Sequence, residues 1–405
     1  MWRQTDDIQY VEGLLARFYE IGANDAGGVT RLGYTEQEDA MHSAFAQMGE
    51  ELGLDILTDQ VGNTFLSNTG PDRPYYLVGS HLDSVVDGGR YDGVAGVLAG
   101  LLAIRWAKRD DEKIPIRAAA FRCEESSNFG VCMIGSELIT GGMGQEAGSL
   151  RGKDGRTLGE VFAQKGYSLS PRPITGMRKY IEMHIEQGRV LEEAGQRIGI
   201  VKTIAGLRRF SFYIRGKAEH SGATPMSMRS DALCAAAELI LEIEKIGASH
   251  SNRQSVATVG VLNNLPNSIN VIPGETQLKV DIRGVDDASL DEMERLIDRA
   301  GEEICKRRGA RLIKEKISAA KPVALNVKMQ DDLERIASGM GLSCRRMASG
   351  AGHDAMKFVG LCDVALVFIP CKEGISHNKV EFTGIENILE GARVIYEYLR
   401  EEYAK

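Results

Sequence analysis

The sequence predicts an α/β fold, in which a mixed and mostly parallel sheet with flanking helices is interrupted by a smaller inserted domain. Short apolar runs, each followed by a glycine-rich or acidic turn, alternate with amphipathic stretches of helical length. Strands that alternate with helices form largely parallel sheets. The 405 residues also exceed the usual size of a single hydrophobic core, so two domains are expected.

Four apolar runs are the predicted strands of the main sheet, and each is followed by polar residues. They cover residues 75–78, 116–121, 180–183 and 365–369. Residues 94–107 have the composition and length of a helix, in which Gly96 and Gly100 would permit close packing on the sheet. In parallel sheets the ligand site lies beyond the carboxyl ends of the strands. The polar residues after these runs are therefore the candidate site.

The middle of the chain predicts a second, α+β domain. Its elements follow the order strand, helix, strand, strand, helix, strand, at residues 209–215, 230–246, 255–261, 276–282, 289–307 and 311–317. That order is the split βαβ arrangement of a ferredoxin-like domain. Hinges are expected at Gly206 and at residues 319–322. The predicted domains are residues 1–206 with 318–405, and the inserted residues 207–317.

The composition excludes several classes of partner. A net charge of −8 argues against nucleic acid and against an anionic membrane surface. The first ten residues are polar, and no stretch is long and apolar enough to span a bilayer. The seven cysteines are scattered and form no CxxC pair, so neither a disulfide framework nor a zinc knuckle is indicated. A cytoplasmic protein is the expectation.

A histidine and two aspartates follow the first predicted strand. His81 could offer a neutral imidazole to a metal ion, and Asp83 could accept the other N–H of its ring. Asp92, which lies between glycines at the start of a predicted helix, could bridge two cations with its two oxygens. An alternative for Asp92 is a helix N-cap, and the two interpretations are compatible.

Two adjacent carboxylates, Glu124 and Glu125, follow the second predicted strand. Adjacent carboxylates at an apolar strand end repel each other unless a cation or a proton separates them. One of them as a metal ligand and the other as a general base would remove that cost. The alternative is a solvated acidic turn.

Three of the seven histidines, His81, His184 and His377, lie at predicted strand ends or in the loops that follow. A single histidine is more often structural than a ligand, but three that converge with Asp92 and Glu125 favour a metal site. We expect His42 and His250 to be surface or capping residues and assign no ligand role to His353.

Six motifs together resemble the M20 metallopeptidase superfamily. Within it they resemble the hydantoinase/carbamoylase branch of N-carbamoyl-L-amino-acid hydrolases, allantoate amidohydrolases and β-ureidopropionases. The resemblance runs from the N-terminal region to the C-terminus and rests on residues 79–83, 88–93, 124–125, 182–188, 350–355 and 374–378. The string His184-Ile185-Glu186-Gln187-Gly188 is the most specific, because the peptidases of the superfamily have a carboxylate at the position of His184.

The resemblance implies two divalent metal ions. One would be held by His81, Asp92 and His184, and the other by Asp92, Glu125 and His377, with Glu124 as the general base. Mixed nitrogen and oxygen ligands suit Zn²⁺, and Mn²⁺, Co²⁺ or Ni²⁺ could occupy the same positions.

The resemblance also assigns one further catalytic residue and several residues that bind substrate. His220 would be catalytic: it would polarise the scissile carbonyl and stabilise the oxyanion. Asn270 and Arg283 would bind the substrate, with the Arg283 guanidinium on its carboxylate, although a surface arginine is the alternative. Gln187 would bind the ureido or carboxylate group, and the turn that contains Gly352 could present backbone N–H groups.

The implied enzyme is an amidohydrolase that acts on the C–N bond of linear amides, converting an N-carbamoyl-L-amino acid to the amino acid, ammonia and carbon dioxide. Allantoate is the alternative substrate, favoured by the pair Arg208-Arg209. A peptidase or N-deacylase is a further alternative, against which His184 counts. Glu124 argues against a scaffold without catalysis. The family implies a homodimer that forms through the inserted domain, which would also act as a lid.

Overall fold

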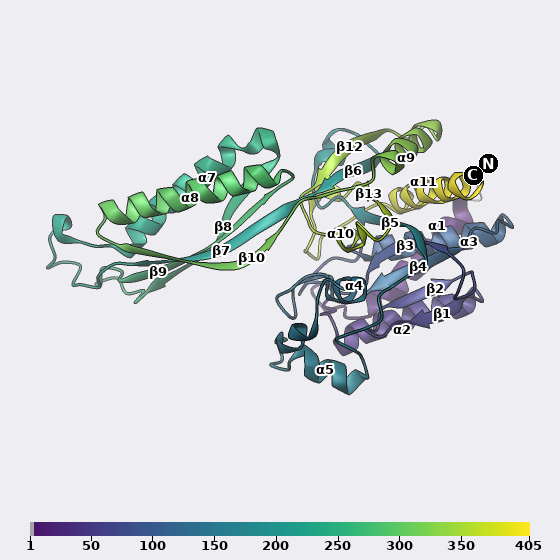
Figure 1. Cartoon of the computed structure of the whole chain (residues 1–405), viewed down its shortest axis with the longest axis horizontal. Helices are drawn as coiled ribbons and strands as arrows, with labels where there is room; N and C mark the ends of the chain where they lie inside the picture. The colour runs from purple at the N-terminus through teal and green to yellow at the C-terminus, as the bar shows by residue number, and fades with distance from the viewer. Residues whose placement is uncertain (1–3) are drawn as a thin grey trace. The chain divides into compact units, whose positions relative to one another are not determined.

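The main body of the molecule is built on one nine-stranded sheet. The computed structural model describes residues 4–405 and divides them into two compact units. The sheet has the order β1-β2-β4-β3-β5-β13-β6-β11, and β12 pairs with β6 (Figure 1). Its strands are β1 (Asp55–Thr58), β2 (Thr64–Ser67), β3 (Tyr75–His81), β4 (Ile116–Phe121), β5 (Met177–Ile185), β6 (Ile198–Ile204), β11 (Val323–Ala324), β12 (Cys344–Ser349) and β13 (Asp363–Ile369).

The centre of this sheet is parallel and its margins are antiparallel. β3 pairs in parallel with β4 and β5, and β5 pairs in parallel with β13. β2 runs antiparallel to β4, and β6 antiparallel to β13. The predicted mixed, largely parallel sheet is therefore confirmed. The four predicted strands are β3, β4, β5 and β13, and three of them extend beyond their apolar runs.

Two long helices, α3 (Val94–Arg109) and α11 (Ile385–Tyr403), pack against one face of the sheet. A Cβ atom on Gly96 would lie 2.2 Å from the Met183 carbonyl oxygen, and one on Gly100 would lie 2.5 Å from that of Val78. Glycine at these positions therefore lets α3 approach the sheet closely, as the sequence predicted. The same face of β5 buries Ile181 and Met183 in the large core.

Seven further helices of this unit lie among the described residues. They are α1 (Gln4–Glu20), α2 (Glu36–Glu51), α4 (Ile134–Thr140), α5 (Leu158–Lys165), α6 (Val190–Glu193), α9 (Val327–Gly339) and α10 (Ala355–Phe358), with 3₁₀ turns at Gln145–Ser149 and Lys372–Gly374.

Side chains alternate along a strand, so the residues of β5 on the face opposite Met183 are Tyr180, Glu182 and His184. The Phe358 ring of α10 packs on Tyr180 with a centroid distance of 4.6 Å.

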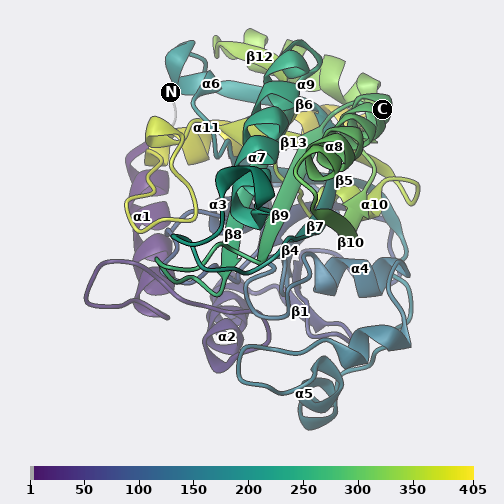
Figure 2. The ribbon, with the colours of Figure 1, turned by 90° about the vertical axis from the view of Figure 1, so that its left-hand side faces the viewer.

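The second unit comprises Thr203–Ala324 with Ala348–Gly352. Its antiparallel sheet has the order β10-β7-β9-β8, from β7 (Gly206–Arg215), β8 (Ser255–Leu265), β9 (Glu275–Gly284) and β10 (Arg311–Ala320). Helices α7 (Ala232–Ser249) and α8 (Asp287–Arg307) lie side by side on one face (Figures 1 and 2). Short 3₁₀ turns occur at Met226–Met228 and Ser251–Arg253. This connection and strand order is the split βαβ topology.

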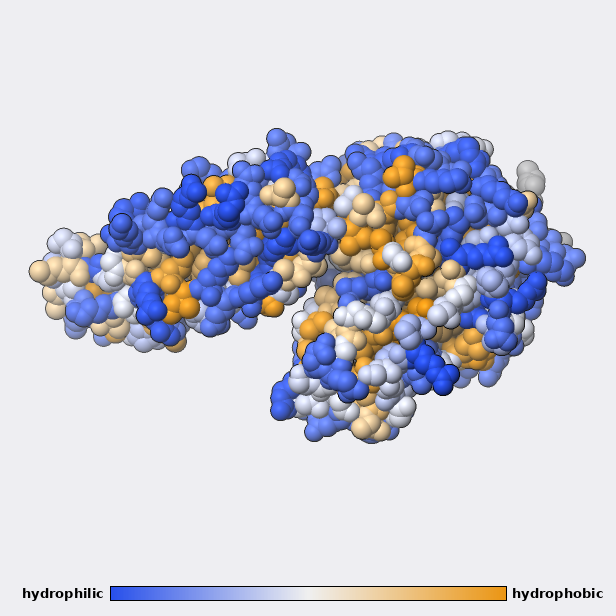
Figure 3. Space-filling model, in the orientation of Figure 1, coloured by the Kyte–Doolittle hydropathy of each residue, from blue (hydrophilic) through white to orange (hydrophobic). Residues whose placement is uncertain are grey.

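The core of the second unit lies between these helices and the sheet. α8 buries Leu290, Met293 and Ile297, whereas its outer face is hydrophilic (Figure 3). Gly206, an expected hinge, is the first residue of β7, where an added Cβ atom would lie 2.5 Å from the Pro322 nitrogen. Among residues 4–405, no helix is long and apolar enough to cross a membrane.

Candidate active site

Two groups of potential metal ligands meet at Asp92. The first consists of His81, Asp92 and His184, and the second of Asp92, Glu125 and His377; within each group the ligand atoms lie within 4.8 Å of one another. Asp92 Oδ1 lies 3.3 Å from His81 Nε2 and 3.1 Å from His184 Nε2. Asp92 Oδ2 lies 3.5 Å from His377 Nε2, which is 2.9 Å from Glu125 Oε1. Each carboxylate oxygen of Asp92 thus faces one group.

The sheet positions the two histidines of the first group. His81 is the last residue of β3, His184 lies near the end of β5, and the two strands are parallel neighbours. His184 Nδ1 lies 2.9 Å from the Ile185 carbonyl oxygen, and His81 Nδ1 lies 3.3 Å from Asp83 Oδ1. In a neutral imidazole these acceptors favour the proton on Nδ1, which leaves Nε2 of each ring, beside Asp92, as the atom that could bind a cation.

The loop around Asp92 requires glycine. Gly93, with φ of 66°, is the N-cap of α3, and an added Cβ atom would lie 2.5 Å from the His81 carbonyl oxygen. The helix-cap interpretation of Asp92 is therefore wrong. Its carboxylate instead accepts hydrogen bonds from Gln187 Nε2 at 2.9 Å and Ser376 Oγ at 2.7 Å.

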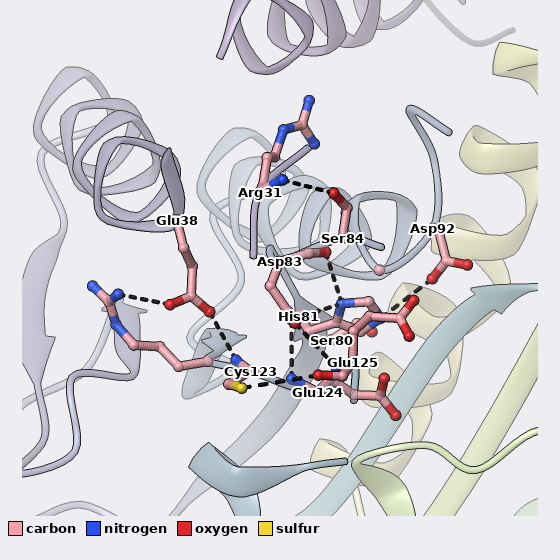
Figure 4. Close-up of polar contacts among 12 residues, drawn as sticks. Arg31, Glu38, Ser80, His81, Asp83, Ser84, Asp92, Cys123, Glu124 and Glu125 are labelled. Atoms are coloured by element: carbon pink, nitrogen blue, oxygen red, sulfur yellow. Dashed lines mark hydrogen bonds and ion pairs between the residues drawn. The ribbon is translucent and has the colours of Figure 1, made fainter. Parts of the chain in front are cut away.

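Buried carboxylates hold the main chain after β4. The Glu38 carboxylate accepts the Cys123 N–H at 2.7 Å, and the two oxygens of Asp83 accept the N–H groups of Glu124 and Glu125 at 3.0 Å each. Cys123 has φ of 52°, in the left-handed region, which turns the chain sharply at this point. Figure 4 shows Glu38 and Asp83 directed at this short segment.

Glu124 and Glu125 are both buried, so the alternative of a solvated acidic turn is wrong. Burial raises the pKa of Glu124 well above its ordinary value; the charge of His81 opposes this shift and that of Glu125 adds to it. Glu124 belongs to neither ligand group, although it adjoins Glu125 in the chain. The structure thus groups Glu125, but not Glu124, with the other potential metal ligands.

The environments of Gln187, His353 and Cys123 bear on what these residues can do. Gln187 has φ of 58°, and its buried Oε1 atom has no hydrogen-bond partner among the described residues. His353 is buried with its ring 4.7 Å from that of His184. Burial raises the pKa of the Cys123 thiol well above its usual range, which disfavours a nucleophilic thiolate.

The expectation of a surface position for His42 is wrong. Its side chain is buried on α2, where Nδ1 lies 2.9 Å from Thr64 Oγ1. His250 is also buried, but it is the C-cap of α7 and so matches the capping role.

The predicted catalytic residue His220 and the predicted substrate-binding residues Asn270, Arg283 and Gly352 belong to the second unit. His220 is exposed, and its Nδ1 accepts the N–H groups of Gly222 and Ala223 at 3.1 and 3.2 Å. Its Nε2 atom therefore carries the proton. The Ser221 N–H donates to the Asn270 carbonyl oxygen, which places these two segments side by side.

The Arg283 guanidinium is fixed at two of its edges. Nε and Nη2 donate to Asp281 Oδ2 at 3.2 and 3.1 Å, and Nη1 donates to the Gly350 carbonyl oxygen at 3.0 Å. Arg283 therefore lies against the turn that contains Gly352, and its side chain is about one-third exposed.

The comparisons with known proteins identify the family. The family model "Peptidase family M20/M25/M40" matches residues 77–401. The chain belongs to this family. It is 37% identical over 386 residues to an N-carbamoyl-L-amino acid amidohydrolase of Geobacillus stearothermophilus, covering 93% of this chain and 94% of that protein. It is 33% identical over 397 residues to the allantoate amidohydrolase of Escherichia coli strain K12, covering 96% of each.

A solved structure of an M20 relative has the same fold over nearly its whole length. The amidase of the hydantoinase/carbamoylase family from Burkholderia multivorans superposes with a TM-score of 0.89 at 34% identity, covering 97% of each chain. The sequence-based resemblance to this branch of the M20 family is confirmed.

The sequence did not reveal Glu38, Arg122 or Ser376 as neighbours of the site. Arg122 pairs with Glu38 at 2.9 Å, and both are buried. An arginine two residues before the acidic pair, at the end of an apolar run, was the available signal. Its partner lies 84 residues away in the chain and could not be named from local pattern.

Proposed function

We propose that this chain is a binuclear metal-dependent amidohydrolase that cleaves the ureido C–N bond of an N-carbamoyl-L-amino acid. The products are the amino acid, ammonia and carbon dioxide. The observation that carries the proposal is the pair of ligand groups that share Asp92, with Glu124 beside them. The amidohydrolase relatives support the choice of a ureido substrate.

The donor set fits two divalent cations. Neutral imidazole nitrogens and carboxylate oxygens are the ligands that Zn²⁺ accepts, and Mn²⁺, Co²⁺ or Ni²⁺ suit the same set. Asp92 and Glu125 are buried carboxylates whose charge a cation would neutralise. When bound, such ions polarise a carbonyl oxygen and promote ionisation of water.

We assign proton transfer, positioning of the base and oxyanion stabilisation to three further residues. Glu124 takes a proton from the attacking water and passes it to the departing nitrogen. Asp83 aims Glu124 by accepting its N–H and that of Glu125. The Nε2–H of His220, left free by the hydrogen bonds at Nδ1, donates to the developing oxyanion.

Substrate selection is assigned to Arg283, Asn270, Gln187 and Gly352. Asp281 and the Gly350 carbonyl hold the Arg283 guanidinium in one orientation and use three of its five N–H groups, which leaves one N–H on each Nη atom for an α-carboxylate. The unpartnered Gln187 Oε1 is an acceptor for a ureido N–H.

Allantoate is the second candidate substrate, because relatives at 33% identity carry that name. The Arg208-Arg209 pair adds little to it. Arg208 Nη2 pairs with Asp287 and Asp291 of α8, and Arg209 pairs with Asp281. Both guanidinium groups are engaged within the second unit.

We further propose a homodimer that forms through the second unit, which also acts as the lid. β8 is an edge strand of that unit's sheet, and Val256, Leu262 and Leu265 on it are exposed. An exposed apolar edge strand is a template for pairing with another chain. The seven cysteines are free thiols, which suits the cytoplasmic location that we propose.

A substrate screen tests the proposed function. The chelator-treated protein is reconstituted with Zn²⁺, Mn²⁺ or Co²⁺ and assayed with N-carbamoyl-L-amino acids, allantoate, 3-ureidopropionate and N-acyl amino acids. We expect metal-dependent release of ammonia, fastest with N-carbamoyl-L-amino acids. Full activity after chelation, or turnover of N-acyl amino acids alone, would refute the proposal.

A further inference from the structure

A second buried carboxylate lies against Asp92, on the loop that carries His377. Glu381 is 3% exposed, and its Oε1 atom accepts the N–H groups of Tyr91 at 2.8 Å and Asp92 at 3.0 Å. These contacts join residues that are 289 and 290 positions apart in the chain. One oxygen of Glu381 therefore fixes two consecutive peptide groups at the bridging residue.

The other oxygen of Glu381 reaches the Asp92 side chain through Ser376. The Ser376 hydroxyl lies 3.1 Å from Glu381 Oε2 and 2.7 Å from Asp92 Oδ2. A hydroxyl has one proton to donate, and the shorter contact is to Asp92. Glu381 thus restrains the main chain of Asp92 directly. It also contacts the Ser376 hydroxyl, which in turn donates to the Asp92 carboxylate.

The backbone is shaped to admit this side chain. An added Cβ atom on Gly89 would lie 2.2 Å from both Glu381 Cδ and Oε1. Only glycine at position 89 leaves room for the carboxylate beneath the loop. The Glu381 N–H donates to the Asn378 carbonyl oxygen at 3.0 Å, which ties the carboxylate to the turn directly after His377.

We propose that Glu381 is a positioning residue that locks the Asp92 loop to the His377 loop, so that both metal-binding groups are formed at once. This inference rests on the proposed metal-dependent function, but it concerns a residue outside both ligand groups. Asp83 holds the N–H groups of Glu124 and Glu125 in the same manner. The two carboxylates thus fix, from opposite loops, the backbone of the two acidic ligands.

The test is metal affinity, measured on the full-length protein freed of metal. Zn²⁺ is titrated in competition with a chromophoric chelator against wild type, Glu381→Ala, Glu381→Gln and Gly89→Ala. We expect Glu381→Ala and Gly89→Ala to weaken Zn²⁺ binding by roughly 10- to 100-fold, the range for lost partners of ligands. Glu381→Gln keeps an oxygen that can accept both N–H groups, so it should retain most of the affinity.

A matched control separates positioning from general loss of stability. Asp231 also accepts two consecutive N–H groups, those of Leu233 and Cys234, but it caps α7 in the second unit. Asp231→Ala should lower thermal stability and leave Zn²⁺ affinity unchanged. Wild-type affinity in Glu381→Ala, or an equal loss in Asp231→Ala, would overturn the inference. Failure of wild type itself to bind any of Zn²⁺, Mn²⁺, Co²⁺ and Ni²⁺ would instead remove the proposed function.

Discussion

Replacement of Asp83 by asparagine should disturb the active site, because Asp83 holds the main-chain N–H groups of Glu124 and Glu125. Both oxygens of Asp83 are in use: Oδ1 accepts the Glu124 N–H and lies 3.3 Å from His81 Nδ1, and Oδ2 accepts the Glu125 N–H. Asparagine supplies one acceptor oxygen and one NH₂ donor, so at least one buried N–H loses its partner. An unsatisfied buried donor costs about 1–3 kcal/mol. We expect the free energy of unfolding of the metal-free protein to fall by about 2 kcal/mol.

The same substitution removes the negative charge behind His81. Loss of a carboxylate that orients a ligand imidazole typically weakens metal binding by roughly 10- to 100-fold. Urea denaturation gives the first quantity and competitive Zn²⁺ titration gives the second. Asp231→Asn is the control, because one oxygen of Asp231 accepts both of its N–H groups and the amide can retain them. A Zn²⁺ affinity within twofold of wild type in Asp83→Asn would refute the reasoning.

Three further predictions concern the general base, the recognition of the substrate carboxylate and the pH dependence of stability. Glu124→Gln should lower kcat by about 10²- to 10⁴-fold and leave Zn²⁺ affinity nearly unchanged; a variant with full turnover would eliminate Glu124 as the base. Arg283→Ala should lower kcat/KM for N-carbamoyl amino acids by roughly 10- to 100-fold, as expected for a lost charged hydrogen bond, and an equal loss with an analogue that lacks the carboxylate would contradict the anchor. Burial raises the pKa of Glu38 from its ordinary 4.5 to about 7, so the folded protein holds this proton more tightly than the unfolded chain. The stability that Glu38 contributes below about pH 4.5 should therefore be lost as the pH rises through 7, and Glu38→Gln should flatten that slope in denaturation curves; parallel profiles for the two proteins would contradict this assignment.

The sequence predicted the sheet well where apolar runs mark its strands. β4 has the predicted bounds, whereas β3 and β5 continue into their polar ends, because the hydrogen bonds of the strands extend through His81 and His184. The hydrophobic pattern reports burial in an apolar core and therefore ends at a buried polar residue. Strand boundaries at the site are thus misplaced for a physical reason.

The supporting residues could not be predicted because their partners are distant in the chain. Glu381 meets Asp92 across 289 positions, and Glu38 meets Cys123 across 85. The sequence around each of these two glutamates does not distinguish it from an ordinary surface acid. Asp92 illustrates the opposite error, since its place before a helix suggested a cap, but Gly93 occupies that position.

The division of the Asp92 carboxylate between two groups has a thermodynamic consequence. Oδ1 faces His81 and His184, and Oδ2 faces His377, so an ion bound in either proposed group would fix the carboxylate orientation for the other. Binding at the two positions is then linked, and the coupling free energy is the same whichever ion enters first. Replacement of His184 should consequently change the affinity of the position built on Glu125 and His377, although it contributes no atom to it. The metal content of the proposed binuclear enzyme would then be a property of the pair rather than of two independent sites.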